Sequence, residues 1–205
     1  MWYKTAKVEK EMEDFFKERT NKHIDLVRKY CKKIADYDKE KFGELVERAK
    51  VHDDSKFEEP EKGPYVYITW QYKCKDEGKE FDIPEDMKEK MSLATEKHVK
   101  NKLNTHHPEA SCDKEVALIN RENRDLPPKQ IVDATKMTDL DIGEMVADWC
   151  GMSAEKKSNP KDWADKNVNI RWKFTDKQKD LIYELIKEVW ERKKTTQESG
   201  TSDRE

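Results

Sequence analysis

The feature that most constrains the fold is the recurrence of apolar residues at helical spacing in separate segments of the chain. The clearest stripe consists of Ile24, Val27, Cys31 and Ile34, which fall on one face of a helix. Further apolar stripes follow Thr138 and Thr175, residues of a type that often caps a helix N-terminus. The pattern therefore predicts an all-α fold.

The expected helices are 3–19, one that Thr20 caps, 39–52, 85–104, one from Thr138 to about 152, a short one after Asn159-Pro160, and a last one after Thr175. Residues 110–137 are expected to be irregular, with one short helix. Segment 65–72 has the β-branched and aromatic content of a strand. No partner strand of similar quality is visible, and an isolated strand leaves its backbone groups unpaired. We therefore interpret this segment as a buried helix.

The core of this bundle is expected to be thin. Charged residues make up 42% of the 205 residues and hydrophobic ones 34%, a balance close to that of disordered chains. Six Trp, seven Tyr and six Phe argue against disorder, because each aromatic side chain buries a large area. We expect residues 1–194 to form one domain with a heavily solvated surface, and residues 195–205 to form a disordered polar tail.

Charge and cysteine content exclude several classes of protein. A formal net charge of −3 gives no general attraction to nucleic acid, so nucleic-acid binding is not expected. The four cysteines are far apart in sequence, which favours reduced thiols over a cysteine-based zinc site. The sequence contains no apolar run of membrane-spanning length. We expect a cytoplasmic protein without membrane contact, and composition leaves the oligomeric state open.

The candidate functional centre is the adjacent pair His52-Asp53. An imidazole nitrogen and a carboxylate oxygen together suit a divalent metal. The remaining histidines lie in segments that can face this pair, and a late acid follows: His23, His98, His106, His107 and Asp148. The expected cofactor is one or two divalent ions, with Mn, Co, Fe, Mg and Zn all compatible. His23 and His98 are also compatible with ordinary buried histidines.

Polar residues close to these candidates suggest supporting roles. Glu144 lies four residues before Asp148 and interrupts an otherwise apolar helix, so it is a candidate ligand or a group that orients a histidine. Arg48 and Lys56 lie four residues on either side of His52, and either cation could neutralise a phosphate. If one helix continued through this stretch, all three would share one side.

Two more polar residues flank the paired histidines. Asn104 and Glu109 border the turn that contains His106 and His107. Pro108 is expected to end the preceding helix there and to push His107 out of helical geometry. Asn104 and Glu109 are therefore candidates for outer contacts to the metal ligands.

The order His, His-Asp, His, His-His, Asp resembles the HD-domain superfamily of metal-dependent phosphohydrolases. The resemblance implies an HD-domain-like helical bundle, with helices contributing metal ligands to a central cleft. It also implies that a metal-activated water attacks a small phosphorylated substrate. Asp53, Lys56 and Arg48 would then be the catalytic candidates. The Gly-Tyr-Pro signature of the cyclic-dinucleotide phosphodiesterases is absent, and His98 and His106 are only eight residues apart. We therefore do not expect this protein to be specific for cyclic dinucleotides.

A closer resemblance is to a family of small bacterial and phage proteins, domain of unknown function 5662. Three runs carry it, namely Arg48 to Phe57, His98 to Glu109 and Glu144 to Trp149. That family implies no activity, so the reaction must be inferred from the chemistry of the site. Three possibilities remain open. They are a phosphohydrolase acting on a nucleotide or other small phosphoester, a mixed-valent di-iron oxygenase, and a non-catalytic metal-stabilised module that binds a ligand or partner.

Overall fold

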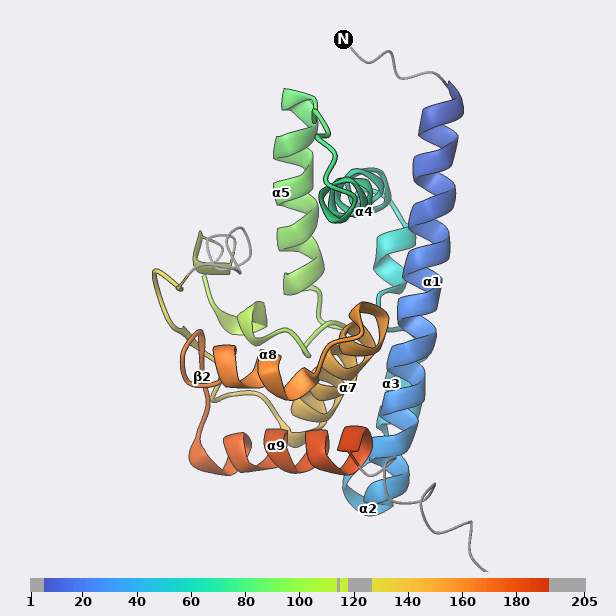
Figure 1. The fold of residues 1–205 in the computed structure, drawn as a ribbon. Helices are drawn as coiled ribbons and strands as arrows, with labels where there is room; N and C mark the ends of the chain where they lie inside the picture. Colours follow the sequence, from blue (N-terminus) through green and yellow to red (C-terminus); the bar gives the residue numbers. More distant parts are fainter. Residues whose placement is uncertain (1–5, 114, 118–126, 192–205) are drawn as a thin grey trace, which may run out of the picture.

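The computed structural model describes residues 6–113, 115–117 and 127–191, and it confirms the all-α fold (Figure 1). Among these residues, named strands are limited to β1 (Val132–Asp133) and β2 (Trp172–Lys173), which pair in parallel. The polar tail expected at 195–205 lies outside the described residues. Within the described part of the chain, no helix combines the length and the apolar character needed to cross a membrane.

The longest helix is α1 (Ala6–Tyr37), a single element of 32 residues. The prediction of a helix break at Thr20 is therefore wrong. Thr20 is buried inside α1, where its side chain belongs to the same inward stripe as Phe16 and Val27. The stripe runs without interruption past Thr20, so burial along the whole length outweighs the capping preference of one threonine. This continuity places His23 in the middle of α1.

The prediction of a single helix over residues 39–52 is also wrong. The chain instead forms α2 (Lys39–Phe42) and α3 (Leu45–Arg48), followed by a turn and the 3-10 helix η1 (Asp54–Phe57). Asp53 has φ 62°, in the left-handed region, which ends any continuous helical path. The proposed alignment of Arg48, His52 and Lys56 along one helix side is consequently lost.

Segment 65–72 is helical, as predicted, within α4 (Lys62–Asp76). Helix α5 (Glu85–Lys100) ends earlier than the expected residue 104, with Asn101 in extended conformation as its C-cap. Pro108 therefore does not end this helix, but begins the 3-10 helix η2 (Pro108–Ser111). The seven residues between α5 and η2 form a turn that carries both paired histidines.

The C-terminal helices begin where the sequence predicts. Thr138 caps α7 (Asp139–Lys156) through a reciprocal capping box with Asp141, and Thr175 caps α9 (Asp176–Trp190) in the same way with Gln178. Asn159 caps α8 (Pro160–Asn167). A side chain that accepts a hydrogen bond from the first turn satisfies a backbone N–H that has no partner within the helix.

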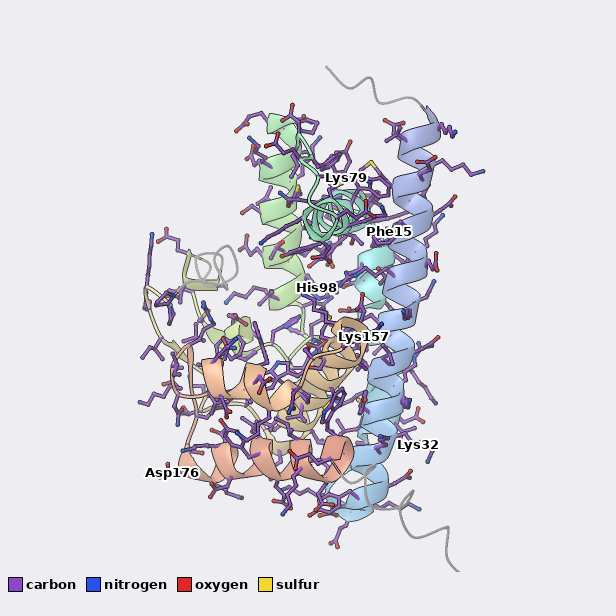
Figure 2. The ribbon with its side chains drawn as sticks, in the orientation of Figure 1. Phe15, Lys32, Lys79, His98, Lys157 and Asp176 are labelled. Carbon is purple, nitrogen blue, oxygen red and sulfur yellow. The ribbon has the colours of Figure 1, made fainter. Side chains whose placement is uncertain are left out.

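Helix α7 is the centre of the larger of two hydrophobic cores. Its buried side chains pack with those of α1, α2, α3 and α9, and the rings of Trp149 and Trp172 stack beside them. A smaller core joins α1, α4 and α5 through Phe16, Tyr65 and Ala94. The α4–α5 pair and the α7–α9 group lie in different halves of the molecule, and α1 runs along both (Figure 1). His98 lies where the two halves meet (Figure 2).

Gly143 allows α7 to pack closely on the short helices α2 and α3. A Cβ atom built at this position would lie 2.9 Å from Leu45 Cδ1 and 3.3 Å from Phe42 Cδ1. The next residue on α7 is Glu144 and the next turn carries Asp148, so this close contact also sets the depth of two candidate site residues.

Replacing Gly143 by valine should destabilise the protein by about 2 kcal/mol, because extra methyl groups in a packed core force neighbouring side chains to shift. Urea unfolding measures this change as a lower midpoint with an unchanged slope. Gly63→Ala is the matched control, since a Cβ there meets nothing closer than 3.8 Å. Equal midpoints for Gly143→Val and the wild type would show that the contact is not tightly packed.

Candidate metal centre

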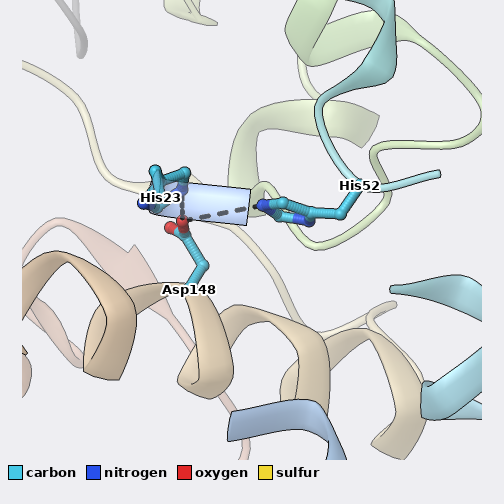
Figure 3. Close-up of side chains that lie close together, drawn as sticks. All are labelled: His23, His52 and Asp148. Atoms are coloured by element: carbon cyan, nitrogen blue, oxygen red, sulfur yellow. Dashed lines mark ion pairs between the residues drawn. The ribbon is translucent and has the colours of Figure 1, made fainter. Parts of the chain in front are cut away.

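Five candidate ligands from four separate segments meet between the two halves of the molecule. They are His23 of α1, His52 and Asp53 of the turn before η1, His106 of the turn after α5, and Asp148 of α7. All except Asp148 are buried. Figure 3 shows the carboxylate of Asp148 facing the rings of His23 and His52. These candidate ligands thus lie close together in the fold, although they are up to 125 residues apart in the chain (148 − 23).

The ligand atoms surround a small volume. The Nε2 atom of His23 lies 2.9 Å from Oδ1 of Asp148 and 3.7 Å from Oδ2 of Asp53. The Nε2 atom of His52 lies 3.9 Å from each of the same two oxygens. Two sets of three residues each offer ligand atoms within 4.8 Å of one another: His23, His52 and Asp148, and His52, Asp53 and His106. His52 belongs to both sets.

Several buried polar atoms at this centre fit a metal ion. Nε2 of His52 and Nε2 of His106 are buried and form no hydrogen bond with any described residue. A buried polar atom without a hydrogen bond is costly. A coordination bond would satisfy both. Imidazole nitrogens and carboxylate oxygens suit a divalent transition metal, and carboxylates also suit Mg²⁺. The donor set therefore fits the ion that the sequence predicts.

The left-handed backbone of Asp53 explains how two adjacent residues serve one centre. Asp tolerates this conformation better than most residues. The turn lets both His52 and Asp53 face the same volume, which neighbouring positions on a regular helix do not, because they differ by about 100° in direction. Strained backbone of this kind is found mainly at functional sites.

Lys56 is the cation in direct contact with the centre. Its Nζ lies 2.5 Å from Oδ2 of Asp53 and sits over the ring of Tyr65. Burial by itself raises the pKa of Asp53, but the charges of Lys56 and His52 and the contact with His98 hold that pKa well below its usual value. Asp53 is therefore a permanent carboxylate.

Arg48 is held by protein groups away from the metal-facing atoms. Its guanidinium donates to Glu144 Oε2 at 2.9 Å, to Asp141 Oδ1 at 2.9 Å and to Thr105 Oγ1 at 2.8 Å. In this structure the guanidinium is thus paired with protein groups, and a phosphate contact of Arg48 stays a prediction. Thr105 also donates to Asp141.

Glu144 contacts the histidines on the edge opposite the metal-facing nitrogens. Its Oε1 lies 3.0 Å from Nδ1 of His52 and 3.3 Å from Nδ1 of His106. Burial raises the pKa of Glu144, whereas its contacts with these two histidines hold that pKa below its usual range. Asp148 is likewise held ionised, chiefly by its hydrogen bond with His23 in opposition to burial, which would raise its pKa. The prediction that Glu144 contacts a histidine agrees with this geometry.

His98 sits on the far side of Asp53, with Nε2 3.1 Å from Asp53 Oδ1. Its Nδ1 is 3.1 Å from Oε2 of Glu61, which also accepts a hydrogen bond from Ser55. The predicted outer residue Asn104 donates to the carbonyl of His98 and lies 3.0 Å from its Nδ1. Glu61 cannot be singled out from the sequence, because nothing local separates it from Glu58 and Glu59 in the same acidic run.

The two neighbouring histidines have different surroundings. The ring of His106 packs 4.6 Å from that of His52, whereas the ring of His107 packs 5.2 Å from that of His98. His107 is in neither three-residue set. Glu109, the other predicted outer residue, is fully buried and accepts a hydrogen bond from Nε1 of Trp172 at 3.1 Å. It thereby anchors the start of η2 to the larger core.

A divalent ion should stabilise the folded protein, because only the folded chain brings these ligands together. Adding Mn²⁺ or Zn²⁺ at about 100 times the dissociation constant should add about 2.7 kcal/mol to the free energy of unfolding. A chelator should remove the gain. The measurement is the unfolding temperature over a metal titration.

Asp148→Asn should weaken this stabilisation at least tenfold in metal concentration, since the amide removes a charged oxygen ligand. Asp25→Asn is the matched control, because Asp25 is an exposed carboxylate on the same helix as His23. If the metal raised the unfolding temperature of both variants equally, the ion would bind elsewhere.

Metal affinity should fall as the pH is lowered. Burial lowers the pKa of His52, but three carboxylates more than offset this effect and raise it: those of Asp53, Glu144 and Asp148. His52 therefore keeps a second ring proton to higher pH in the metal-free protein, and this proton must leave before the ring can bind an ion. Between about pH 6 and 8 we expect tighter binding with rising pH. Calorimetry in two buffers measures the released protons, and pH-independent affinity would contradict the assignment.

The comparisons with known proteins give one positive result. Residues 12–188 match the profile of DUF5662, described as a family of unknown function. Searches of the curated proteins and of the solved structures gave no significant match. The matched range includes all five histidines and all the acidic residues assigned above. The chain therefore belongs to the DUF5662 family.

Proposed function

We propose that this protein is a metal-dependent phosphohydrolase acting on a nucleotide or another small phosphoester. The observation that carries the proposal is the meeting of a histidine–carboxylate centre with one lysine. Two sets of ligand atoms share His52 at this centre, and Lys56 contacts the carboxylate of Asp53. A cation beside a divalent metal site suits an anionic substrate, because both positive charges attract the same phosphoryl group.

The ligand order gives independent support. His23, the doublet His52-Asp53 and the closing Asp148 occur in the order typical of HD-domain phosphohydrolases, and all four lie together in the fold. Membership of that superfamily is part of the proposal. The superfamily resemblance favours phosphoester hydrolysis, and the di-iron oxygenase branch of the same superfamily is the alternative.

A bound divalent ion would supply an activated water by lowering its pKa towards about 7. The protein groups perform the remaining tasks. Asp53 and Asp148 stay ionised and provide the negative charge that holds a cation. The ammonium group of Lys56 can move from Asp53 to an oxygen of the phosphoryl group. The side chain of Lys56 is 19% exposed, so a substrate can reach it from solvent.

The discriminating experiment is a panel of phosphoesters assayed with metal-free protein and with added Mn²⁺, Co²⁺, Fe²⁺, Mg²⁺ or Zn²⁺. The panel contains nucleoside mono-, di- and triphosphates, cyclic nucleotides and a chromogenic phosphoester. Metal-dependent release of phosphate or alcohol supports the proposal. Metal binding without turnover of any phosphoester contradicts it. Aerobic iron loading that yields a mixed-valent spin-resonance signal would indicate the oxygenase alternative, and recovery of an unchanged bound ligand would indicate a binding module.

Lys56→Met should lower kcat/KM on the best substrate by about 100-fold or more, because a preorganised cation at the developing charge is lost. Metal content should stay at the wild-type level, since the lysine is not a ligand. Lys50→Met is the matched control, because the exposed ammonium group of Lys50 pairs with Glu47. Wild-type kcat/KM for Lys56→Met would remove the lysine from the proposed mechanism.

A further inference from the structure

One carboxylate oxygen serves two histidines at the centre. Oε1 of Glu144 lies within 3.3 Å of Nδ1 on both His52 and His106. The two rings come from different turns of the chain, one before η1 and one after α5, and their centroids are 4.6 Å apart. Glu144 is the buried group of α7 that contacts both.

This contact fixes which ring nitrogen carries the proton. An ionised carboxylate can only accept hydrogen bonds, so a neutral imidazole beside it must present an N–H. Nδ1 of His52, which lies 3.0 Å from Oε1 in hydrogen-bond geometry, is then the protonated atom of that ring. Nδ1 of His106 lies 3.3 Å from the same oxygen without an aligned hydrogen bond, and the negative charge of the oxygen favours a proton on the nitrogen that faces it. Nε2 on each ring keeps a lone pair, and both Nε2 atoms are buried without a hydrogen bond to a described residue. His52 and His106 are the two histidines of the ligand set that includes Asp53.

Glu144 contacts a cation in addition to the two histidines. Arg48 contacts Oε2 of Glu144 at 2.7 Å, and Asp141 and Thr105 in turn hold the guanidinium. An arginine remains protonated at any ordinary pH. Oε1 is therefore available as an acceptor while both histidines are neutral, which is the form that binds a metal.

We propose that Glu144 is a positioning residue that sets His52 and His106 in the same tautomer, so that both offer Nε2 to one metal ion. The Arg48–Asp141–Thr105 group holds Glu144 in place for this task. The inference rests on the proposed metal centre and is independent of which reaction occurs there. It identifies Nε2 of each histidine as the ligand atom. It also identifies Glu144 as the carboxylate by which α7 orients both rings.

The direct test is nitrogen NMR of the metal-free, full-length protein at alkaline pH, where the histidines are neutral. His52→Gln and His106→Gln assign the signals. For the wild type we expect Nδ1 to be protonated on both rings and Nε2 to be unprotonated. Protonation of Nε2 on either ring would overturn the proposal, and this measurement needs no activity and no Glu144 variant.

Glu144→Gln should change the tautomer ratio of both rings, because an amide can donate as well as accept. It should also weaken Zn²⁺ binding by about 10- to 100-fold, the usual effect of removing an outer hydrogen-bond partner of a ligand. Glu144→Asp keeps the charge and should restore part of the affinity. Glu61→Gln is the matched control, since Glu61 is also buried but contacts His98. It should shift only the His98 signals.

The outcomes separate this inference from the proposed reaction. Nδ1-protonated rings together with weaker Zn²⁺ binding in Glu144→Gln support the positioning role even if no phosphoester is hydrolysed. Unchanged tautomers and unchanged Zn²⁺ affinity in a folded Glu144→Gln variant overturn the role even if hydrolysis is found. Equal effects of Glu144→Gln and Glu61→Gln on His52 and His106 would also overturn it, because they would indicate a general loss of packing.

Discussion

The arrangement depends on how this protein keeps ionised carboxylates inside a helical bundle. Asp53 and Glu144 are almost completely buried, and burial disfavours the charged form of an acid. Lys56 contacts Asp53 and Arg48 contacts Glu144, while the contacts of Glu144 with His52 and His106 keep its pKa low. The remaining charge faces histidine rings. A divalent ion would complete this balance, because it supplies positive charge where the unpaired nitrogens and oxygens meet.

The two hydrophobic cores explain why the centre lies where it does. Helix α1 contributes Phe16 to the smaller core and Val27 to the larger one, and His23 lies between them on the same stripe. Helix α7 packs against α1 closely enough that Asp148 reaches His23. The turn before η1 and the turn after α5 then close over the gap with His52 and His106. The polar centre thus lies between the two hydrophobic cores.

Much of the helical framework was predictable from local sequence, because periodicity and capping act over a few residues. Thr138 and Thr175 begin their helices as expected, and segment 65–72 is helical despite its strand-like composition. The predicted helix boundaries were wrong where long-range packing outweighed a local signal. Thr20 looks like a cap but is buried inside α1. Similarly, the helix expected to reach residue 52 is interrupted, since the turn at Asp53 brings its carboxylate into the centre.

The sequence by itself determined the all-α class and identified the candidate metal ligands, including the His52-Asp53 doublet and the late Asp148. Only the tertiary structure decided which atoms face one another. It placed Arg48 against Glu144 and Glu61 against His98. The physical reason is that a side chain's neighbours across the fold depend on how helices far apart in sequence pack. The spacing of residues along the chain does not indicate how these helices pack.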